Sequence, residues 1–419
     1  VSTGSYNISG GLIAMPRTYI IPCTLGSYNT AGSDLTFIRS LILGTGSGSY
    51  SLTGSAGILL KSLLLPAGIG SYTQNGTSAT LLRNRVIPAG IGSYSLTGLD
   101  IDLLSSKQIS ALAGSYNING SVVSLLNSYV LPSSGGSYSL TGTQASFVRN
   151  YIIASGSGSY SLSGSIAGLL KSIICSVGIG SYTSSGVNST LLYNRQLPSN
   201  PGAYSISGTV SELLCSRIFV SSPGSYSING MPITIIRGYV LPSISGNYTI
   251  SGSSIGLLKN TIMSGLAGSY SLSGSPISLL RFAILPTGIG SYSLIGSSAT
   301  LDYYRFFMLA CGRGMFSVDG SSIDLLQNRV TSADAGSYAL TGGLTNLLYS
   351  RIFIPLAGTY TIIGTDSSYD KMFGIFAIAG NYGVAGSSAS LLSSRILNST
   401  AGSYLITGYA AAIGRILSL

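Results

Sequence analysis

The chain repeats one pattern of apolar and polar residues every 22 positions. A tyrosine marks each repeat, at intervals of 22 residues from Tyr6 to Tyr292 and again from Tyr338 to Tyr404. Phe316 takes the place of tyrosine in the intervening repeat, which follows a two-residue insertion. With this ring counted as position zero, the unit occurs nineteen times and fills the 419 residues. Such a short internal period is typical of stacked repeat architectures and not of separate globular domains.

Apolar and polar residues alternate within each repeat. Tyrosine and leucine or isoleucine occupy positions 0 and +2, while serine, threonine or asparagine occupies +1 and +3, as in residues 48–54. Alternation with period two, bounded by glycine, predicts a half-buried β-strand. Apolar residues at +7 and +9, and an apolar pair at +14 and +15 that proline often follows, predict two further short strands. We expect a bend between them near +11 to +12.

Two glycines recur in every repeat, at positions −2 and +4. A residue kept as glycine nineteen times within one chain indicates a backbone requirement. The requirement is either a positive φ angle or the close approach of another segment.

These patterns predict an all-β fold, a β-solenoid-like array with two to three short strands per repeat. A 22-residue unit is too short to enclose a core, so neighbouring repeats must stack and place like residues in ladders. An antiparallel ribbon or sandwich built from the same repeats remains the alternative. We expect one continuous array over 1–419, regular at 1–298, with irregular copies at about 299–316 and 365–386. The first ladder residues are Tyr6, Tyr28, Tyr50, Tyr72 and Tyr94, with Gly10, Gly32, Gly54, Gly76 and Gly98.

Composition argues against catalysis and toward assembly. Only 7% of the residues are charged and there is no histidine, while apolar residues make up 45%. A chain with so much apolar surface and so little charge is expected to have a partner surface or to polymerise. The four cysteines have no CxxC spacing, and no nucleophile elbow or phosphate-binding loop occurs, so we expect no enzyme activity, metal or cofactor. No apolar run is long enough to predict a membrane span.

The basic residues form the most informative chemical pattern. Nineteen of the twenty occupy +11 or +13. This predicts a basic stripe along one edge, which would either hold an anionic polymer or act as a solvated face that prevents wrong sheet pairing. The second interpretation is favoured because nucleic-acid grooves interleave exposed aromatics, whereas the position-zero tyrosines alternate with inward residues. Nucleic acid is therefore not the expected partner, and an anionic polysaccharide or other surface polymer remains possible. The stripe includes Arg17, Arg39, Lys61, Arg83, Arg149, Lys171, Arg195 and Arg217.

The motif Gly-Ser-Tyr-x-(Leu/Ile)-(Thr/Ser)-Gly, followed by Leu-Leu-x-x-Arg, resembles tandem-repeat proteins of bacteriophage virions and bacterial surfaces. The resemblance covers the whole chain and implies a structural role in an extracellular or virion location. It implies no particular binding residue.

We therefore expect a structural protein, the subunit of an extracellular filament or fibre that assembles as a homopolymer, head to tail, laterally or both. The first alternative is a tail-fibre or adhesin-type module that recognises an anionic surface. A minor alternative is an ice-binding protein, suggested by hydroxyl columns such as Ser51 and Thr53. The irregular copies and the apolar last repeat are the expected assembly contacts: Phe306, Phe307, Met308, Met372, Phe373, Ile413, Ile416 and Leu417.

Overall fold

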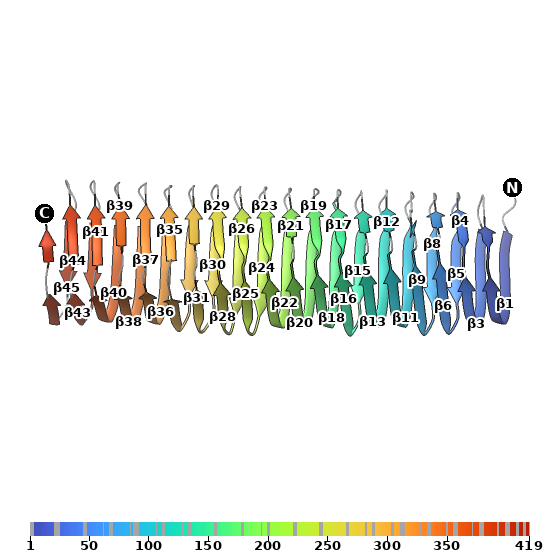
Figure 1. Ribbon diagram of the computed structural model, residues 1–419, viewed down its shortest axis with the longest axis horizontal. Coiled ribbons are helices and arrows are strands. Elements are labelled where there is room, and N and C mark those ends of the chain that lie inside the picture. Colours follow the sequence, from blue (N-terminus) through green and yellow to red (C-terminus); the bar gives the residue numbers. More distant parts are fainter. Residues whose placement is uncertain are drawn as a thin grey trace. The chain divides into compact units, whose positions relative to one another are not determined.

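The computed structural model contains β-strands as its regular elements throughout the part of the chain that it describes (Figure 1). Each repeat forms one coil, with its strands in two sheets. The described residues are 4–20, 26–44, 48–61, 63–66, 70–83, 85–86, 92–105, 107–110, 114–127, 129–132, 136–154, 157–176, 180–193, 195–198, 202–220, 224–242, 246–264, 268–280, 283–286, 290–302, 306–310, 315–326, 328–332, 337–348, 351–354, 359–370, 372–376, 381–391, 394–398, 403–407, 410–413 and 416–418.

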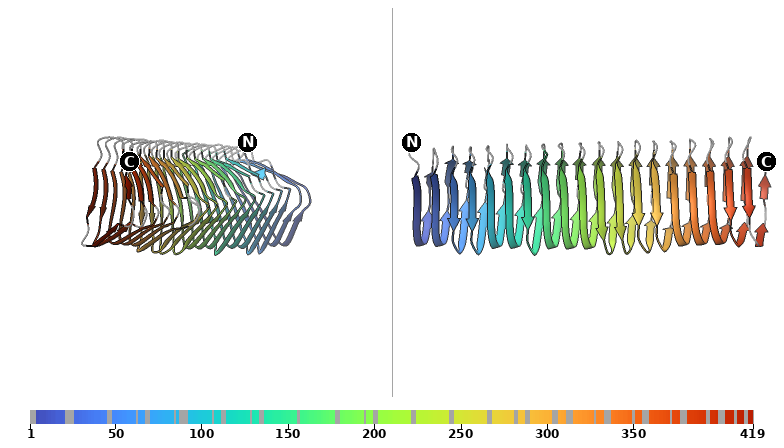
Figure 2. Two further views of the ribbon diagram at one scale, coloured as in Figure 1. Left: turned by 60° about the vertical axis from the view of Figure 1, so that its left-hand side comes forward. Right: turned by 180° about the vertical axis from the view of Figure 1, so that it is seen from behind.

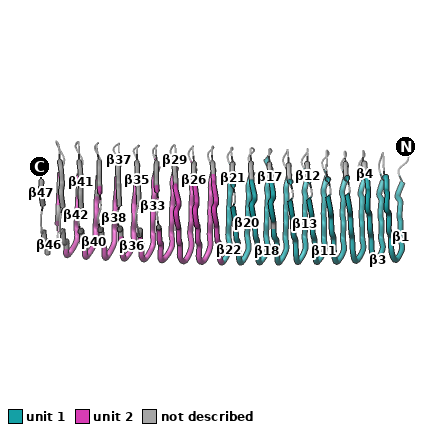
Figure 3. The backbone as a smooth tube through the Cα atoms, in the orientation of Figure 1, with its two compact units in different colours: residues 1–209 teal, residues 210–419 magenta. Residues whose placement is uncertain are grey.

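The chain divides into two compact units, residues 1–209 and 210–419 (Figure 3). Each unit has the same internal organisation and is described by itself. That the two units form one continuous array over 1–419 remains a prediction.

In unit 1 the first sheet holds the strands that begin near position zero and those near +7, which often merge into one twelve-residue strand. The second sheet holds the strands that begin near +13. The first sheet comprises β1 (Gly4–Met15), β3 (Gly26–Phe37), β5 (Ser49–Thr53), β6 (Ala56–Leu60), β8 (Ser71–Asn75), β9 (Ser78–Leu82), β11 (Ser93–Leu104), β13 (Ser115–Leu126), β15 (Ser137–Thr141), β16 (Gln144–Val148), β18 (Ser159–Leu170) and β20 (Ser181–Leu192). The second sheet comprises β2 (Thr18–Ile20), β4 (Ser40–Gly44), β7 (Leu63–Pro66), β10 (Arg85–Val86), β12 (Lys107–Ser110), β14 (Tyr129–Pro132), β17 (Tyr151–Ala154), β19 (Ile173–Ser176) and β21 (Arg195–Pro198).

Strand β22 (Ala203–Leu214) contains residues of both units, and unit 2 then repeats the arrangement of unit 1. Its first sheet comprises β24 (Ser225–Gly230), β25 (Ile233–Ile236), β27 (Asn247–Gly252), β28 (Ile255–Leu258), β30 (Ser269–Ser273), β31 (Ile277–Leu280), β33 (Ser291–Ile295), β34 (Ser298–Asp302), β36 (Met315–Leu326), β38 (Ser337–Leu348), β40 (Thr359–Asp370), β42 (Asn381–Ala385), β43 (Ser388–Leu391), β45 (Ser403–Thr407) and β46 (Ala410–Ile413). Its second sheet comprises β23 (Arg217–Val220), β26 (Tyr239–Pro242), β29 (Thr261–Ser264), β32 (Ala283–Pro286), β35 (Phe306–Ala310), β37 (Asn328–Ser332), β39 (Arg351–Ile354), β41 (Met372–Phe376), β44 (Ser394–Asn398) and β47 (Ile416–Ser418).

The described strands pair in parallel with the equivalent strand of the next coil, which Figure 2 shows from two further sides. Tyr94 pairs with Tyr116 and Gly98 with Gly120, so residues 22 apart lie side by side. This register confirms the predicted β-solenoid. It excludes the antiparallel ribbon or sandwich for the described residues, because both of those need strands that run in opposite directions.

The two irregular copies keep the same backbone register. Leu280 pairs with Asp302 and Ala283 with Phe307, so the two extra residues are accommodated between these two pairs. In the second irregular copy, Arg351 pairs with Phe373 as in a regular coil. Deviations from the repeat sequence are therefore absorbed without changing how the coils stack.

The core lies inside each coil and is built from ladders of like residues. Leu96 at +2, Ile101 at +7 and Leu103 at +9 are buried, and the matching residues of neighbouring coils cover them. The position-zero rings also point inward and stack face to face, with ring centroids 4.8 Å apart for Tyr72 and Tyr94. Stacking of aromatic rings adds to the energy of burial.

Phe316 occupies the tyrosine column, stacks on Tyr338 at 4.9 Å and is buried. The column therefore accepts an aromatic ring without a hydroxyl at this position.

The recurring glycines permit close approach between coils and do not supply positive φ angles. No described glycine has a positive φ. A Cβ on Gly54 would lie 2.6 Å from the carbonyl oxygen of Gly32, and one on Gly268 would lie 2.6 Å from that of Gly246. Both positions, +4 and −2, therefore exclude any side chain. Of the two backbone requirements that the sequence allows, the structure selects close approach.

Candidate functional site

The chain turns from the first sheet into the second at position +11, where a residue other than glycine takes a left-handed backbone conformation. The φ angles of ten such residues lie between 51° and 58°. This conformation costs an L-residue roughly 1–2 kcal/mol relative to glycine. The ten residues are Lys61, Arg83, Ser105, Asn127, Arg149, Lys171, Tyr193, Cys215, Arg237 and Lys259.

Hydrogen bonds between coils hold this bend. The backbone N–H of Lys61 donates to the carbonyl of Leu82 at 2.8 Å, and that of Arg149 donates to the carbonyl of Leu170 at 2.9 Å. The bend therefore satisfies its backbone donor without using the side chain at +11. That side chain is left to extend outward.

Position +12 points inward and carries a buried polar ladder. Ser172 and Ser216 are almost fully buried, and so is Asn260. The Asn260 amide accepts a hydrogen bond from the backbone N–H of Gly238, and its Nδ2 donates to the carbonyl of Ile235 at 3.4 Å. The asparagine thus uses the space left by the missing side chain of Gly238. Sequence reasoning misses this ladder, because the bend shifts the alternation by one residue.

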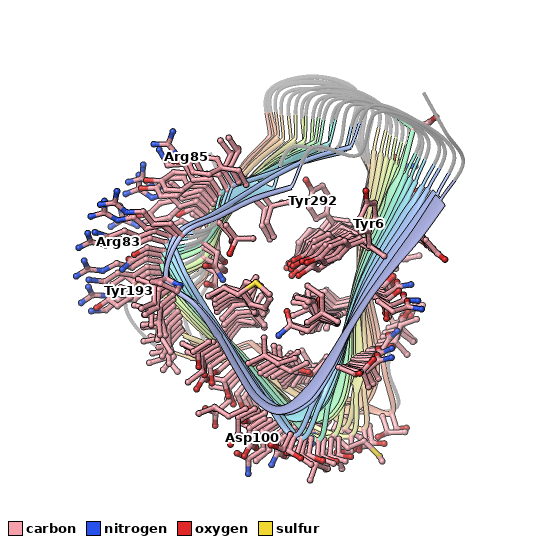
Figure 4. All side chains as sticks on the ribbon, turned by 90° about the vertical axis from the view of Figure 1, so that its right-hand side faces the viewer. Tyr6, Arg83, Arg85, Asp100, Tyr193 and Tyr292 are labelled. Atoms are coloured by element: carbon pink, nitrogen blue, oxygen red, sulfur yellow. The ribbon has the colours of Figure 1, made fainter. Side chains whose placement is uncertain are left out.

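The eight residues that the sequence analysis places in a basic stripe are exposed. Figure 4, which looks along the direction in which the coils stack, shows Arg83 and Arg85 extending outward from one corner of their coil and Tyr193 at the equivalent corner of another coil. All eight residues of the predicted stripe lie at this corner, six at +11 and two at +13. The six are Arg17, Arg39, Lys61, Arg83, Arg149 and Lys171, and the two are Arg195 and Arg217.

Exposed tyrosines lie in the same two columns as the basic residues. Tyr193 is 58% exposed and Tyr129 is 40% exposed. The rings of Tyr129 and Tyr151 stack at 4.9 Å, and the ammonium of Lys107 lies 5.7 Å from the Tyr129 ring centroid. In unit 2 the guanidinium of Arg217 lies 5.6 Å from the Tyr239 centroid. These are cation–π distances.

The expectation of a solvated face without a ligand rested on the position-zero tyrosines, which alternate with inward residues. The tyrosines at +11 and +13 are exposed, so this objection to a ligand does not apply to the corner. The sequence does contain a signal for these exposed tyrosines, because they occupy the same two positions of the repeat as the basic residues. Alternation alone does not reveal that both columns face solvent.

An apolar column runs beside the corner at position +10. Ile38 is 44% exposed and Leu170 is 40% exposed, while Leu104, Leu126 and Leu192 are half-buried. These side chains point outward because +7 and +9 of the same strand point inward. Each pairs with its equivalent in the next coil, as Leu104 does with Leu126. Unit 1 therefore presents a stripe of aliphatic side chains to solvent.

The buried tyrosine hydroxyls form a separate polar column inside the coils. Burial raises the pKa of the Tyr72 and Tyr160 hydroxyls well above the usual value of 10.0, and neighbouring tyrosines raise it further. Neither hydroxyl has a hydrogen-bond partner. These groups stay neutral and are sealed from solvent.

The remaining candidate residues add no reactive centre. The described residues contain no group of three or more potential metal ligands, and none of their elements is a helix that could cross a membrane. Cys215 is a free, half-buried thiol at the corner.

The predicted assembly contacts lie on regular strands. Their backbones keep the register of the stack, and their side chains fall outside the part of the chain that is described. A role in assembly therefore stays a prediction for all eight: Phe306, Phe307, Met308, Met372, Phe373, Ile413, Ile416 and Leu417.

No family model matches the chain, and neither a curated protein nor a solved structure is significantly similar to it. The functional proposals below therefore rest on the geometry of the coils.

Proposed function

We propose that this chain is a structural protein, the subunit of an extracellular or virion-surface fibre held together by side-by-side contacts between β-solenoids. The aliphatic stripe at +10 carries this proposal. Its side chains repeat once per coil, next to polar neighbours, and exposed apolar stripes of this kind mark interaction surfaces.

The partner that fits this stripe is a second molecule of the same chain. A partner must present apolar groups at the spacing of the coils, about 4.8 Å, to cover the stripe along its length. Another molecule of this chain has that spacing because it is built from the same coils. Because every coil carries an equivalent contact, two molecules can also overlap in a staggered register. Contacts that do not close on themselves extend into a fibre.

Three substitutions at +10 test the proposal: Leu104→Thr, Leu126→Thr and Leu170→Thr in one variant. Threonine has a high β-propensity, so the strand is kept, but it presents less aliphatic surface than leucine. The control variant carries Ser95→Thr, Asn117→Thr and Ser161→Thr at the outward position +1. We expect the +10 variant to stay dispersed in sedimentation velocity at concentrations where the parent and the control assemble. Equal assembly of all three proteins would overturn the proposal.

A further inference from the structure

The corner residues of unit 1 form a linear array of cations and tyrosines that the fibre contacts do not use. We call the exposed residues at +11 and +13 the basic corner. Position +13 lies on the second sheet, so the basic corner is next to the +10 stripe but separate from it. We infer that the basic corner binds an acidic polysaccharide, with carboxylate or sulfate groups against the cations and sugar hydroxyls against the tyrosine hydroxyls. The basic corner comprises the basic residues Arg17, Arg39, Lys61, Arg83, Arg85, Lys107, Arg149, Lys171 and Arg195, the tyrosines Tyr19, Tyr129, Tyr151 and Tyr193, and the polar residues Ser105 and Asn127.

In every coil of unit 1 except the one with Asn127 and Tyr129, the corner carries a positive charge, even when its column changes. Where +11 is serine or tyrosine, at Ser105 and Tyr193, the basic residue moves to +13, at Lys107 and Arg195. A charge needed to form the bend would have to stay at +11, since all ten left-handed residues occupy that position. The charge instead serves something that touches both columns.

The backbone of the corner also favours glycine, which this chain never uses at +11 although it contains 57 glycines. Lys61, Arg83, Arg149 and Lys171 all accept the left-handed conformation. Glycine would remove a cost of roughly 1–2 kcal/mol at each position. Six of the ten left-handed residues are nevertheless long and cationic, which supports a role for their side chains in contacts outside the chain.

Few carboxylates oppose these cations. The acidic residues of unit 1 are Asp34, Asp100 and Asp102, at positions +6 and +8 of their repeats, and none occupies +10, +11 or +13. Figure 4 shows Asp100 on a different corner of the coil from Arg83. The field above the basic corner is therefore positive along its length. Such a field attracts a polyanion and makes its binding sensitive to salt.

The arrangement of the tyrosines favours a polysaccharide over single-stranded nucleic acid. A base stacks on the open face of an aromatic ring. The Tyr129 and Tyr151 rings are nearly parallel, and their centroids are only 4.9 Å apart, which leaves no room for a base between them. Lys107 lies over the Tyr129 ring as well. The facing sides of the Tyr129 and Tyr151 rings are thus engaged with each other, and outward groups such as their hydroxyls are available to hydrogen-bond with sugars.

Fluorescence anisotropy of a labelled hyaluronate oligosaccharide with the full chain, kept dispersed at low concentration, tests this inference. The corner variant carries Arg149→Gln, Lys171→Gln and Arg195→Gln. The control carries Ser95→Asp, Asn117→Asp and Ser139→Asp, which lowers the net charge equally on another face. We expect the corner variant to bind at least about tenfold more weakly at low salt, and the control to bind nearly as well as the parent.

Two further probes decide between ligand classes. Labelled neutral dextran should not bind, and oligo-dT of matched length should bind more weakly than hyaluronate. Binding of hyaluronate by the parent should fall at least about tenfold between 50 and 200 mM NaCl. The inference is overturned if hyaluronate does not bind at 50 mM NaCl, if oligo-dT binds more tightly, or if control and corner variants lose affinity equally. Because dispersed protein is measured, none of these outcomes depends on fibre formation.

Discussion

The carbonyl oxygen of Gly142 occupies the place where a side chain on Gly164 would put its Cβ. Gly168, in the same strand β18, has open space at the equivalent point. These two glycines therefore make a matched pair that separates the steric requirement of the stack from general strand propensity.

Gly164→Ala should lower the free energy of unfolding by about 1–3 kcal/mol, because the methyl group forces neighbouring coils apart. Gly168→Ala should raise it by about 0.5–1 kcal/mol, because alanine has less backbone entropy to lose. Denaturant unfolding followed by circular dichroism measures both. Equal effects of the two substitutions would contradict close approach as the role of the recurring glycines.

The buried hydroxyl of Tyr160 has no hydrogen-bond partner, so its ring contributes more than its oxygen. Tyr160→Phe should leave the free energy of unfolding unchanged or raise it by up to about 1 kcal/mol. Tyr160→Ala should lower it by about 3–5 kcal/mol, because it opens a gap in the ring stack. A large loss of stability in the phenylalanine variant would show that the hydroxyl does have a structural role.

The raised pKa values of the buried tyrosines predict sensitivity to alkali. The hydroxyls of Tyr72, Tyr160 and Tyr270 have a pKa well above 10.0 when folded, chiefly because burial disfavours the phenolate. The unfolded chain releases these protons near pH 10, so it binds fewer protons than the folded chain above that pH. Stability should therefore be constant up to about pH 9 and fall as the pH rises above 10.

The urea midpoint between pH 8 and pH 11.5 provides the measurement. A variant with Phe at positions 72, 160 and 270 should lose less stability over this range than the parent does. A parent midpoint that does not change with pH would mean that these hydroxyls titrate normally in the folded state.

The left-handed bend at Lys171 gives a fourth prediction. Lys171→Gly should keep or increase thermal stability, because glycine adopts a positive φ without steric cost. Lys171→Ile should lower the free energy of unfolding by about 1 kcal/mol or more, because a β-branched residue fits this conformation poorly. Thermal melting curves of the parent and both variants provide the measurement. An isoleucine variant as stable as the parent would contradict a left-handed conformation at residue 171.

Much of the fold could be predicted because its signals are local. The spacing of Tyr72, Tyr94 and Tyr116 sets the coil length, and alternation around Leu96 identifies the inward side of the first strand. Parallel stacking follows once each unit is too short to close its own core.

The corner could not be predicted in the same way. A left-handed bend is usually signalled by glycine or asparagine, but Lys61 and Arg83 carry no such signal. After the bend the alternation changes phase, so Asn260 points inward while Tyr239 points outward. Period-two reasoning treats both simply as residues of a strand. The basic stripe of the candidate binding face is thus predicted from its spacing, whereas the bend and the outward direction of its tyrosines emerge only from the three-dimensional coil.

Electron microscopy combined with fibre diffraction of the unmodified protein tests the central claim most directly. We predict uniform fibres of indefinite length, with a sharp reflection near 4.8 Å along the direction in which the coils stack. Isolated particles at every concentration, or aggregates without an ordered 4.8 Å repeat, would contradict the proposal that this solenoid is the subunit of a fibre.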